Sequence, residues 1–161
     1  MSEKILCPYC LSPLEGQRKE CPFCGKSLEN LNPPGTLPFA YLLGSRYTIG
    51  KVLQVDGEGI LYAAVENVSG FRVNIKEYLP VTLSSGRDEN LIVHPKPDSE
   101  VLFKTTRMDF ADLYKTVQRI TPATGLVAVL DVLEANDTVY AVLEVTQGIP
   151  LERYLALRSG P

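Results

Sequence analysis

The sequence has no tryptophan, one histidine and only four cysteines among its 161 residues. It also has no run of about 18 apolar residues, which is the minimum for a helix that crosses a bilayer. Its first ten residues lack the apolar stretch of a signal peptide and already contain two of the cysteines. We therefore expect a cytoplasmic protein without a membrane segment, in a reducing compartment where paired cysteines more often hold a metal than form disulfides.

Neither sign of charge dominates the chain. Its 16 lysines and arginines face 19 aspartates and glutamates, which gives a net charge of −3. The first 30 residues are balanced as well, with four basic and four acidic side chains. Nucleic acids and acidic membranes bind proteins through basic patches. The balance therefore argues against a nucleic acid as partner, and a nucleic-acid-binding ribbon protein is the weaker alternative.

The cysteines form two copies of the pattern Cys-Pro-aromatic-Cys, and they are Cys7, Cys10, Cys21 and Cys24. Two residues between cysteines allow a tight turn with both thiolates on one side of a metal. Four sulfurs at about 2.3 Å then complete a closed tetrahedral zinc shell. The spacing predicts a structural Zn²⁺ site in a ribbon over residues 1–28, with two disulfides as the alternative. Because this shell is complete, we expect no ligand role for His94.

A ribbon this small cannot bury enough apolar surface to fold alone, so we expect metal binding and folding to be coupled. Residues 29–45 are typical of a linker, since prolines and a glycine interrupt any regular element. We expect this linker to separate the core of the ribbon from the core of the next domain. Its apolar residues, Leu37, Phe39, Tyr41, Leu42 and Leu43, predict that its second half lies on that domain.

Residues 46–161 have a different pattern. Alternating β-branched and aromatic residues predict strands at 47–55, 59–67 and 71–78, and two more at 126–134 and 138–145. Apolar residues at helical spacing predict a helix at 110–120, with Thr106 and Asp109 as its capping box, and a second helix begins at 151–157. The polar stretch 80–99 predicts an irregular insert. This order predicts an α+β fold, in which a five-stranded antiparallel sheet carries one packed helix.

Three motifs in this order resemble the N-terminal lobe of bacterial Ser/Thr protein kinases with a zinc ribbon ahead of the kinase domain. Residues 45–62, SRYTIGKVLQVDGEGILY, are similar to the opening motif with its spaced glycines. Residues 74–80, NIKEYLP, are similar to the strand-three motif AIKEYFP, and 151–155, LERYL, to the helix after the hinge. The resemblance covers residues 33–155. It implies a kinase-like small lobe over 46–161, without the large lobe.

The resemblance also implies a site for ATP and Mg²⁺. Its residues would be Lys76 on the phosphates, Gly57 and Gly59 in the covering loop, and Glu144 and Thr146 at the adenine. Two of the family's three spaced glycines are replaced here, by Gln54 and Asp56, and Asp56 would repel a polyphosphate. The glutamate that pairs with the lysine aligns with Leu113, or with Asp112 after a one-residue slip. We therefore expect nucleotide binding to be weak or absent, and the alternative for Lys76 is an amine left in solvent.

A protein kinase takes its catalytic aspartate and its metal-binding residues from the large lobe, so the resemblance implies that residues 46–161 carry no catalytic residue. We expect a non-catalytic, pseudokinase-like interaction or regulatory module with a zinc ribbon. An apolar surface near the hinge is expected to bind a protein partner or a second copy of the chain. The alternative is the N-terminal fragment of a Ser/Thr kinase that binds ATP.

Overall fold

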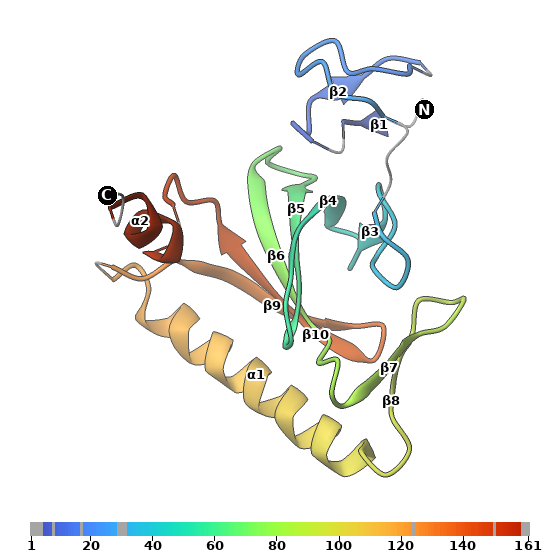
Figure 1. The fold of residues 1–161 in the computed structure, drawn as a ribbon, viewed down its shortest axis with the longest axis vertical. Helices are drawn as coiled ribbons and strands as arrows, with labels where there is room; N and C mark the ends of the chain where they lie inside the picture. The colour runs from blue at the N-terminus through green and yellow to red at the C-terminus, as the bar shows by residue number, and fades with distance from the viewer. Residues whose placement is uncertain are drawn as a thin grey trace.

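The computed structural model describes residues 5–7, 9–16, 18–28, 32–123, 125–149 and 151–158. These residues form an α+β structure (Figure 1). Its strands are β1 (Ile5–Leu6), β2 (Pro13–Leu14), β3 (Leu42–Leu43), β4 (Tyr47–Val55), β5 (Gly59–Glu66), β6 (Arg72–Tyr78), β7 (Ser84–Arg87), β8 (Val93–Pro95), β9 (Val129–Ala135) and β10 (Thr138–Glu144), and its helices are α1 (Glu100–Ile120) and α2 (Leu151–Arg158).

Six of these strands form one antiparallel sheet in the order β3-β4-β5-β6-β10-β9. The five long strands lie where the alternating pattern predicts them. The sixth, β3, lies within the predicted linker and pairs with Tyr47 and Thr48 at the start of β4. The prediction of five strands is therefore wrong by one edge strand. Leu43, which is fully buried, accounts for the difference, because its burial brings this backbone alongside β4.

The helix α1 covers one face of the sheet (Figure 1). Its buried residues Phe103, Phe110 and Ala111 pack in one cluster with Tyr78 of β6 and with residues of β10. The helix begins at Glu100, about three turns before the predicted start. Thr106 therefore lies inside it, and the predicted capping box is wrong. The Thr106 hydroxyl instead donates a hydrogen bond to the Leu102 carbonyl one turn back.

The predicted linker covers the opposite face. Leu37 and Leu43 are fully buried in a cluster with sheet residues that include Tyr62 and Ile75, and Tyr41 packs against the same cluster. The Leu37 N–H donates a hydrogen bond to the Tyr62 hydroxyl at 2.9 Å. The prediction that the second half of the linker lies on the following domain is confirmed. The sheet is thus enclosed by the linker on one side and by α1 on the other.

The prediction that the stretch 80–99 is irregular is wrong in part, because β7 and β8 pair as a hairpin within it. The hairpin brings Arg87 to Glu77 of β6, and both side chains are buried in an ion pair. The hydroxyls of Tyr62 and Tyr140 also donate hydrogen bonds to the Glu77 carboxylate, each at 2.8 Å. Arg87 further donates to the carbonyl of Gly35 in the predicted linker. One buried polar network therefore joins the insert and the linker to the sheet.

The ribbon has a small core of its own, built from Cys7, Leu14 and Cys21. It nevertheless touches the sheet at β4. A Cβ atom placed on Gly50 would lie only 2.6 Å from the Cδ2 atom of Leu11. The buried clusters of the ribbon and of the sheet are distinct, but the linker does not hold the two parts away from each other.

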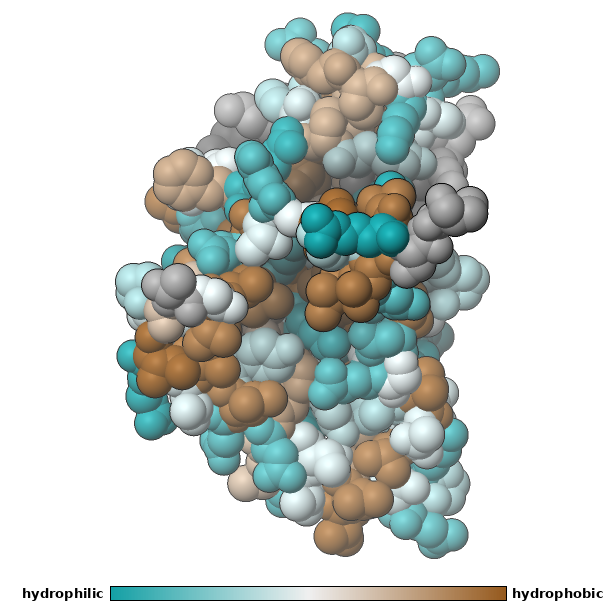
Figure 2. All heavy atoms as spheres, turned by 60° about the vertical axis from the view of Figure 1, so that its left-hand side comes forward, coloured by the Kyte–Doolittle hydropathy of each residue, from teal (hydrophilic) through white to brown (hydrophobic). Residues whose placement is uncertain are grey.

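The face that carries α2 exposes many hydrophobic side chains (Figure 2). The helix α2 has no buried residue. The exposed large hydrophobic residues of the last part of the chain are Leu126, Val127, Leu130, Val145, Ile149, Leu151, Tyr154, Leu155 and Leu157. Single exposed apolar residues are ordinary, but a concentration of this kind is typical of an interaction surface. Among the described residues, no helix has the length and apolar character needed to cross a membrane.

Candidate functional sites

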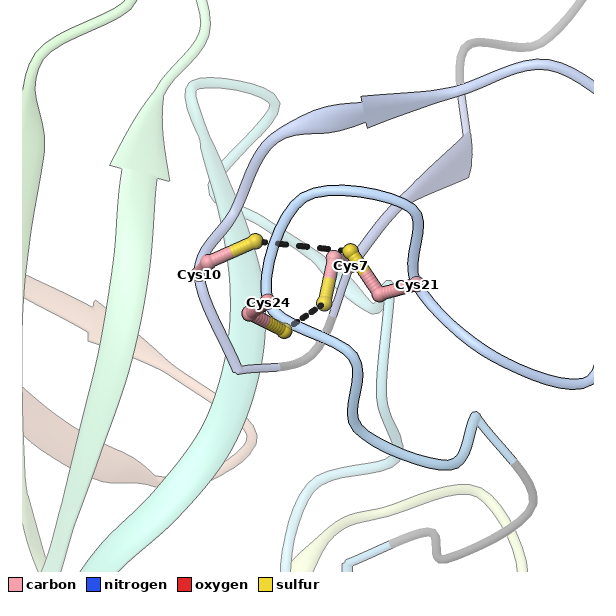
Figure 3. Close-up of side chains that lie close together, drawn as sticks. All are labelled: Cys7, Cys10, Cys21 and Cys24. Carbon is pink, nitrogen blue, oxygen red and sulfur yellow. Dashed lines mark hydrogen bonds between the residues drawn. The ribbon is translucent and has the colours of Figure 1, made fainter.

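The four cysteines lie together, as their spacing predicts (Figure 3). Their Sγ atoms all lie within 4.8 Å of one another. Two pairs are closer, Cys7 to Cys24 at 3.7 Å and Cys10 to Cys21 at 3.6 Å. Two ligands of a tetrahedral ion at about 2.3 Å would be about 3.8 Å apart. The cluster therefore has the dimensions of a site for one metal ion, and all four cysteines are free thiols rather than disulfides.

The backbone of each knuckle turns its N–H groups toward the sulfurs. The N–H of Tyr9 lies 3.4 Å from the Cys7 sulfur, and the N–H of Phe23 lies 3.4 Å from the Cys21 sulfur. Such donors offset the negative charge of a metal-bound thiolate. Each turn ends in the left-handed region, at Leu11 with φ 57° and at Gly25 with φ 69°. The two copies of the sequence pattern thus form two copies of one turn.

The thiols differ in acidity before any metal binds. Burial raises the pKa of the Cys7 thiol to about 12. Burial acts in the same direction on Cys10, but hydrogen bonds with the Ser12 hydroxyl and backbone outweigh it and lower the pKa of Cys10 to about 6. A metal requires thiolates.

Lys76 of β6 lies on the face of the sheet that α1 covers. Its ammonium forms two ion pairs, at 3.3 Å to the Asp56 carboxylate and at 3.1 Å to the Glu58 carboxylate. Both partners belong to the turn between β4 and β5. Burial acts to lower the pKa of Lys76, but the two carboxylates outweigh it and raise that pKa. Lys76 is therefore a cation whose charge is neutralised within its own sheet, and its side chain, 18% exposed, is not left in solvent.

Asp56 also binds the backbone of its own turn. Its Oδ1 atom accepts hydrogen bonds from the N–H groups of Glu58 at 2.9 Å and Gly59 at 3.0 Å, while Oδ2 faces Lys76. Burial acts to raise the pKa of Asp56, but these N–H groups and the charge of Lys76 lower it. The carboxylate therefore bridges the lysine and the N–H groups of the turn. Loop N–H groups and a lysine are the donors that hold the phosphates of a bound nucleotide.

The two candidate loop glycines have different surroundings. A Cβ on Gly59 would lie 1.8 Å from the Glu77 carbonyl oxygen, so the close approach of β5 to β6 excludes any side chain there. A Cβ on Gly57 would meet nothing within 4 Å. Gly59 is therefore required by the sheet itself, whatever its relation to a phosphate.

The helix α1 supplies no acidic partner to Lys76. Among the described residues, the ion pairs of Lys76 are those with Asp56 and Glu58, and Asp112 is not one of its partners. Leu113, the residue aligned with the family's glutamate, lines a cavity of about 430 Å³ that Gly57 and Glu58 also line. The helix therefore presents a leucine toward the acidic turn.

The two candidate hinge residues lie at the far end of β10 from this turn. Ala141 is paired with Lys76 in the sheet, so Glu144 lies about 10 Å farther along the strand. The backbone N–H of Glu144 donates to the Ala128 carbonyl, and its carboxylate accepts from the Ala128 N–H. Thr146 follows the strand and is exposed. The structure thus places Lys76 close to the loop and leaves Glu144 and Thr146 apart from it.

The kinase motif does not predict Asp56 and Glu58 as partners of Lys76, because the loop of that motif binds phosphate. The sequence gives no direct signal for this pairing, because the turn reaches the lysine only through the sheet register that places β5 between β4 and β6.

Comparisons with known proteins support a kinase-like fold. No family model matches the chain, and no curated protein matches it. Among solved structures, it is similar to the apo form of PpkA-294, a bacterial Ser/Thr kinase, with 25% sequence identity and a TM-score of 0.69. The match covers 76% of this chain and 43% of that chain. The sequence therefore spans less than half the length of the kinase structure it resembles.

Proposed function

We propose that this chain is a non-catalytic regulatory or interaction module, in which a zinc ribbon is joined to a kinase-type small lobe that does not bind nucleotide. The observation that carries the proposal is the Asp56 carboxylate, which contacts both the Lys76 ammonium and the N–H groups of the covering turn. In a kinase these donors face the phosphates of ATP. Here an acidic side chain of the protein already takes them.

The electrostatics support the same proposal. A polyphosphate would have to displace Asp56 and Glu58 from Lys76 and then lie beside two uncompensated carboxylates. The helix offers Leu113 where an acidic residue would orient the lysine in a kinase. Charge-assisted contacts to a phosphate are worth about 1.5–3 kcal/mol each. Losing two such contacts lowers the affinity for the nucleotide by more than a hundredfold.

Calorimetric titration with ATP and Mg²⁺ tests this proposal. We expect no binding tighter than the millimolar range. The rival function, an ATP-binding kinase fragment, is favoured by the likeness to PpkA-294. It predicts micromolar affinity that disappears in Lys76→Ala, and that result would overturn the proposal.

We propose zinc as the metal of the cysteine cluster, because four thiolates in a closed tetrahedral arrangement are typical of structural zinc sites. Elemental analysis of the purified protein is expected to find about one zinc per chain. A Cys21→Ser, Cys24→Ser variant is expected to lose it. A metal-free protein whose cysteines react with thiol reagents only after reduction would instead show disulfides.

We propose that the exposed face around α2 takes part in self-association. An isolated helix of eight residues is marginal in water, and none of the side chains of α2 is buried. Leu151 and Leu157 are each 69% exposed, and in a purified sample a second copy of the chain is the protein available to cover them. Sedimentation analysis is expected to show concentration-dependent dimers that weaken in Leu157→Glu and persist in Val68→Glu, a matched change at an exposed residue of the β5–β6 turn. Purely monomeric protein at high concentration would contradict this.

A further inference from the structure

The contact between the ribbon and the sheet joins the metal cluster to the strand that leads into the acidic turn. Leu11, directly after Cys10, is 8% exposed and lies over Gly50 of β4. The Tyr9 ring of the same knuckle lies 5.0 Å from the Nζ atom of Lys51, the next residue of β4. We propose that the metal-loaded first knuckle is a latch on β4, so that release of the metal loosens this strand.

The backbone at Leu11 indicates that its side chain has a specific task. In the second knuckle the equivalent left-handed position is filled by Gly25, which tolerates this conformation. In the first knuckle it is filled by a leucine with φ 57°, which is unfavourable for a side chain of this size. Burial of that side chain against Gly50 offsets the strain. Gly50 in turn has no side chain that would block the approach.

The strand is irregular where the knuckle contacts it. The pairing of β4 with β5 shifts between Ile49 and Val52, which places a bulge at Gly50 and Lys51. Beyond the two-residue β3, this part of β4 is the edge of the sheet. The side chain of Asn32 donates to the Gly50 carbonyl at 2.8 Å and accepts from the Val52 N–H at 2.9 Å. The bulged edge is thus held from outside the sheet, by Asn32 and by the knuckle.

The latch depends on the metal because the knuckle has little else to hold it. Its turn is closed by the hydrogen bonds from Leu11 N–H to the Cys7 carbonyl and from Cys7 N–H to the Ser12 carbonyl. Its core is the small cluster around Cys7, Leu14 and Cys21. Without the ion, a core of this size does not stay folded. Leu11 then loses the backbone geometry that places it on Gly50.

Hydrogen exchange of the full chain, with and without a zinc chelator, tests the latch. Chelation is expected to speed exchange in peptides from 47–55 by about tenfold or more, as one buried leucine is released. Peptides from 129–144, on the far side of the sheet, are expected to change by less than about twofold. Exchange that rises only within residues 5–28 would overturn the proposal.

Two variants separate the latch from the general stability of the ribbon. Leu11→Ala is expected to keep its metal but to show the fast exchange of β4 even when loaded. Phe23→Ala, which changes an exposed apolar residue of the second knuckle, is expected to behave as the wild type. Slow exchange of β4 in metal-loaded Leu11→Ala would show that the contact of Leu11 with Gly50 does not stabilise this strand. If Leu11→Ala does not bind metal, the proposal is judged by the effect of chelation on exchange in residues 47–55 of the wild type.

Discussion

Arg87 and Glu77 form an ion pair in which the two side chains are 2% and 0% exposed. Arg87 comes from the hairpin in the insert, and Glu77 is the residue directly after Lys76 on β6. The carboxylate also accepts hydrogen bonds from Tyr62 and Tyr140, so its charge is fully surrounded by donors. Burial and the nearby Glu77 charge raise the pKa of both tyrosines, which therefore remain protonated donors.

Removal of Arg87 is expected to be among the most damaging single changes in the chain. Arg87→Ala leaves the Glu77 charge buried without a cation, which typically costs about 3–5 kcal/mol of unfolding free energy. Arg46→Ala is the matched control, because Arg46 pairs with Glu66 but its side chain is 56% exposed. Its loss is expected to be about 0–1 kcal/mol. Equilibrium unfolding in urea measures both, and equal losses would contradict the assigned role of the buried pair.

Gly59 and Gly57 allow a test of whether the turn is constrained by the sheet or by a ligand. Gly59→Ala places a Cβ against the Glu77 carbonyl and is expected to cost about 1–3 kcal/mol or more. Gly57→Ala meets open space and is expected to change stability by less than about 0.5 kcal/mol. Thermal unfolding of the two variants, side by side, provides the measurement. A Gly59→Ala protein as stable as the wild type would show that the close approach of β5 and β6 is not needed.

The sequence alone predicts what depends on local pattern. Alternation located the five long strands, and the repeated cysteine spacing located the metal cluster. The sequence does not predict the partner of Arg87. A buried arginine in a polar stretch has the same local pattern as a solvent-exposed arginine, and only the folded chain distinguishes them. The strand β3 was hidden for a similar reason. Two leucines after a proline-rich stretch carry no strand signal until β4 is beside them.

The same limit applied to Lys76. The motif located the lysine, but its partners come from a turn 18 and 20 residues earlier in the chain. The resemblance to kinases predicts an acidic partner on α1, where the expected acid is replaced by Leu113. Only the sheet register, which places β5 between β4 and β6, shows that the turn can reach the lysine.

The acidity of Glu66 predicts a pH dependence. Its carboxylate accepts hydrogen bonds from the Ser69 hydroxyl and N–H, and from Arg46, which lower its pKa from 4.5 to about 2. A lowered pKa in the folded state stabilises the fold above pH 4.5. This contribution is lost as the pH falls from about 4.5 to about 2.

Ser69→Ala removes one of these donors and is expected to move the pKa of Glu66 back toward 4.5. An NMR titration of the Glu66 carboxyl carbon measures it. Ser85→Ala is the control, because the Ser85 hydroxyl donates to the His94 and Pro95 carbonyls and to no carboxylate. If the pKa of Glu66 is unchanged in Ser69→Ala, Ser69 is not the source of the shift.

The last prediction concerns the acidic turn. Asp56→Asn with Glu58→Gln removes both charges from Lys76, while the amide oxygen introduced at position 56 can still accept the N–H groups of residues 58 and 59. Lys76 then has no counter-ion and is free to contact an anion. We expect affinity for Mg²⁺-ATP or inorganic triphosphate to rise at least tenfold, since one charge-assisted contact is worth about 1.5–3 kcal/mol.

The matched control is Asp109→Asn with Asp112→Asn, which changes the net charge equally but lies on α1, where neither residue forms an ion pair with Lys76. Isothermal titration of the two double variants separates a local effect from a general reduction of negative charge. Adding Lys76→Met to the first variant is expected to abolish the gain. Equal affinities for Mg²⁺-ATP in the two double variants would contradict the prediction. They would mean that Asp56 and Glu58 do not prevent Lys76 from binding an anion.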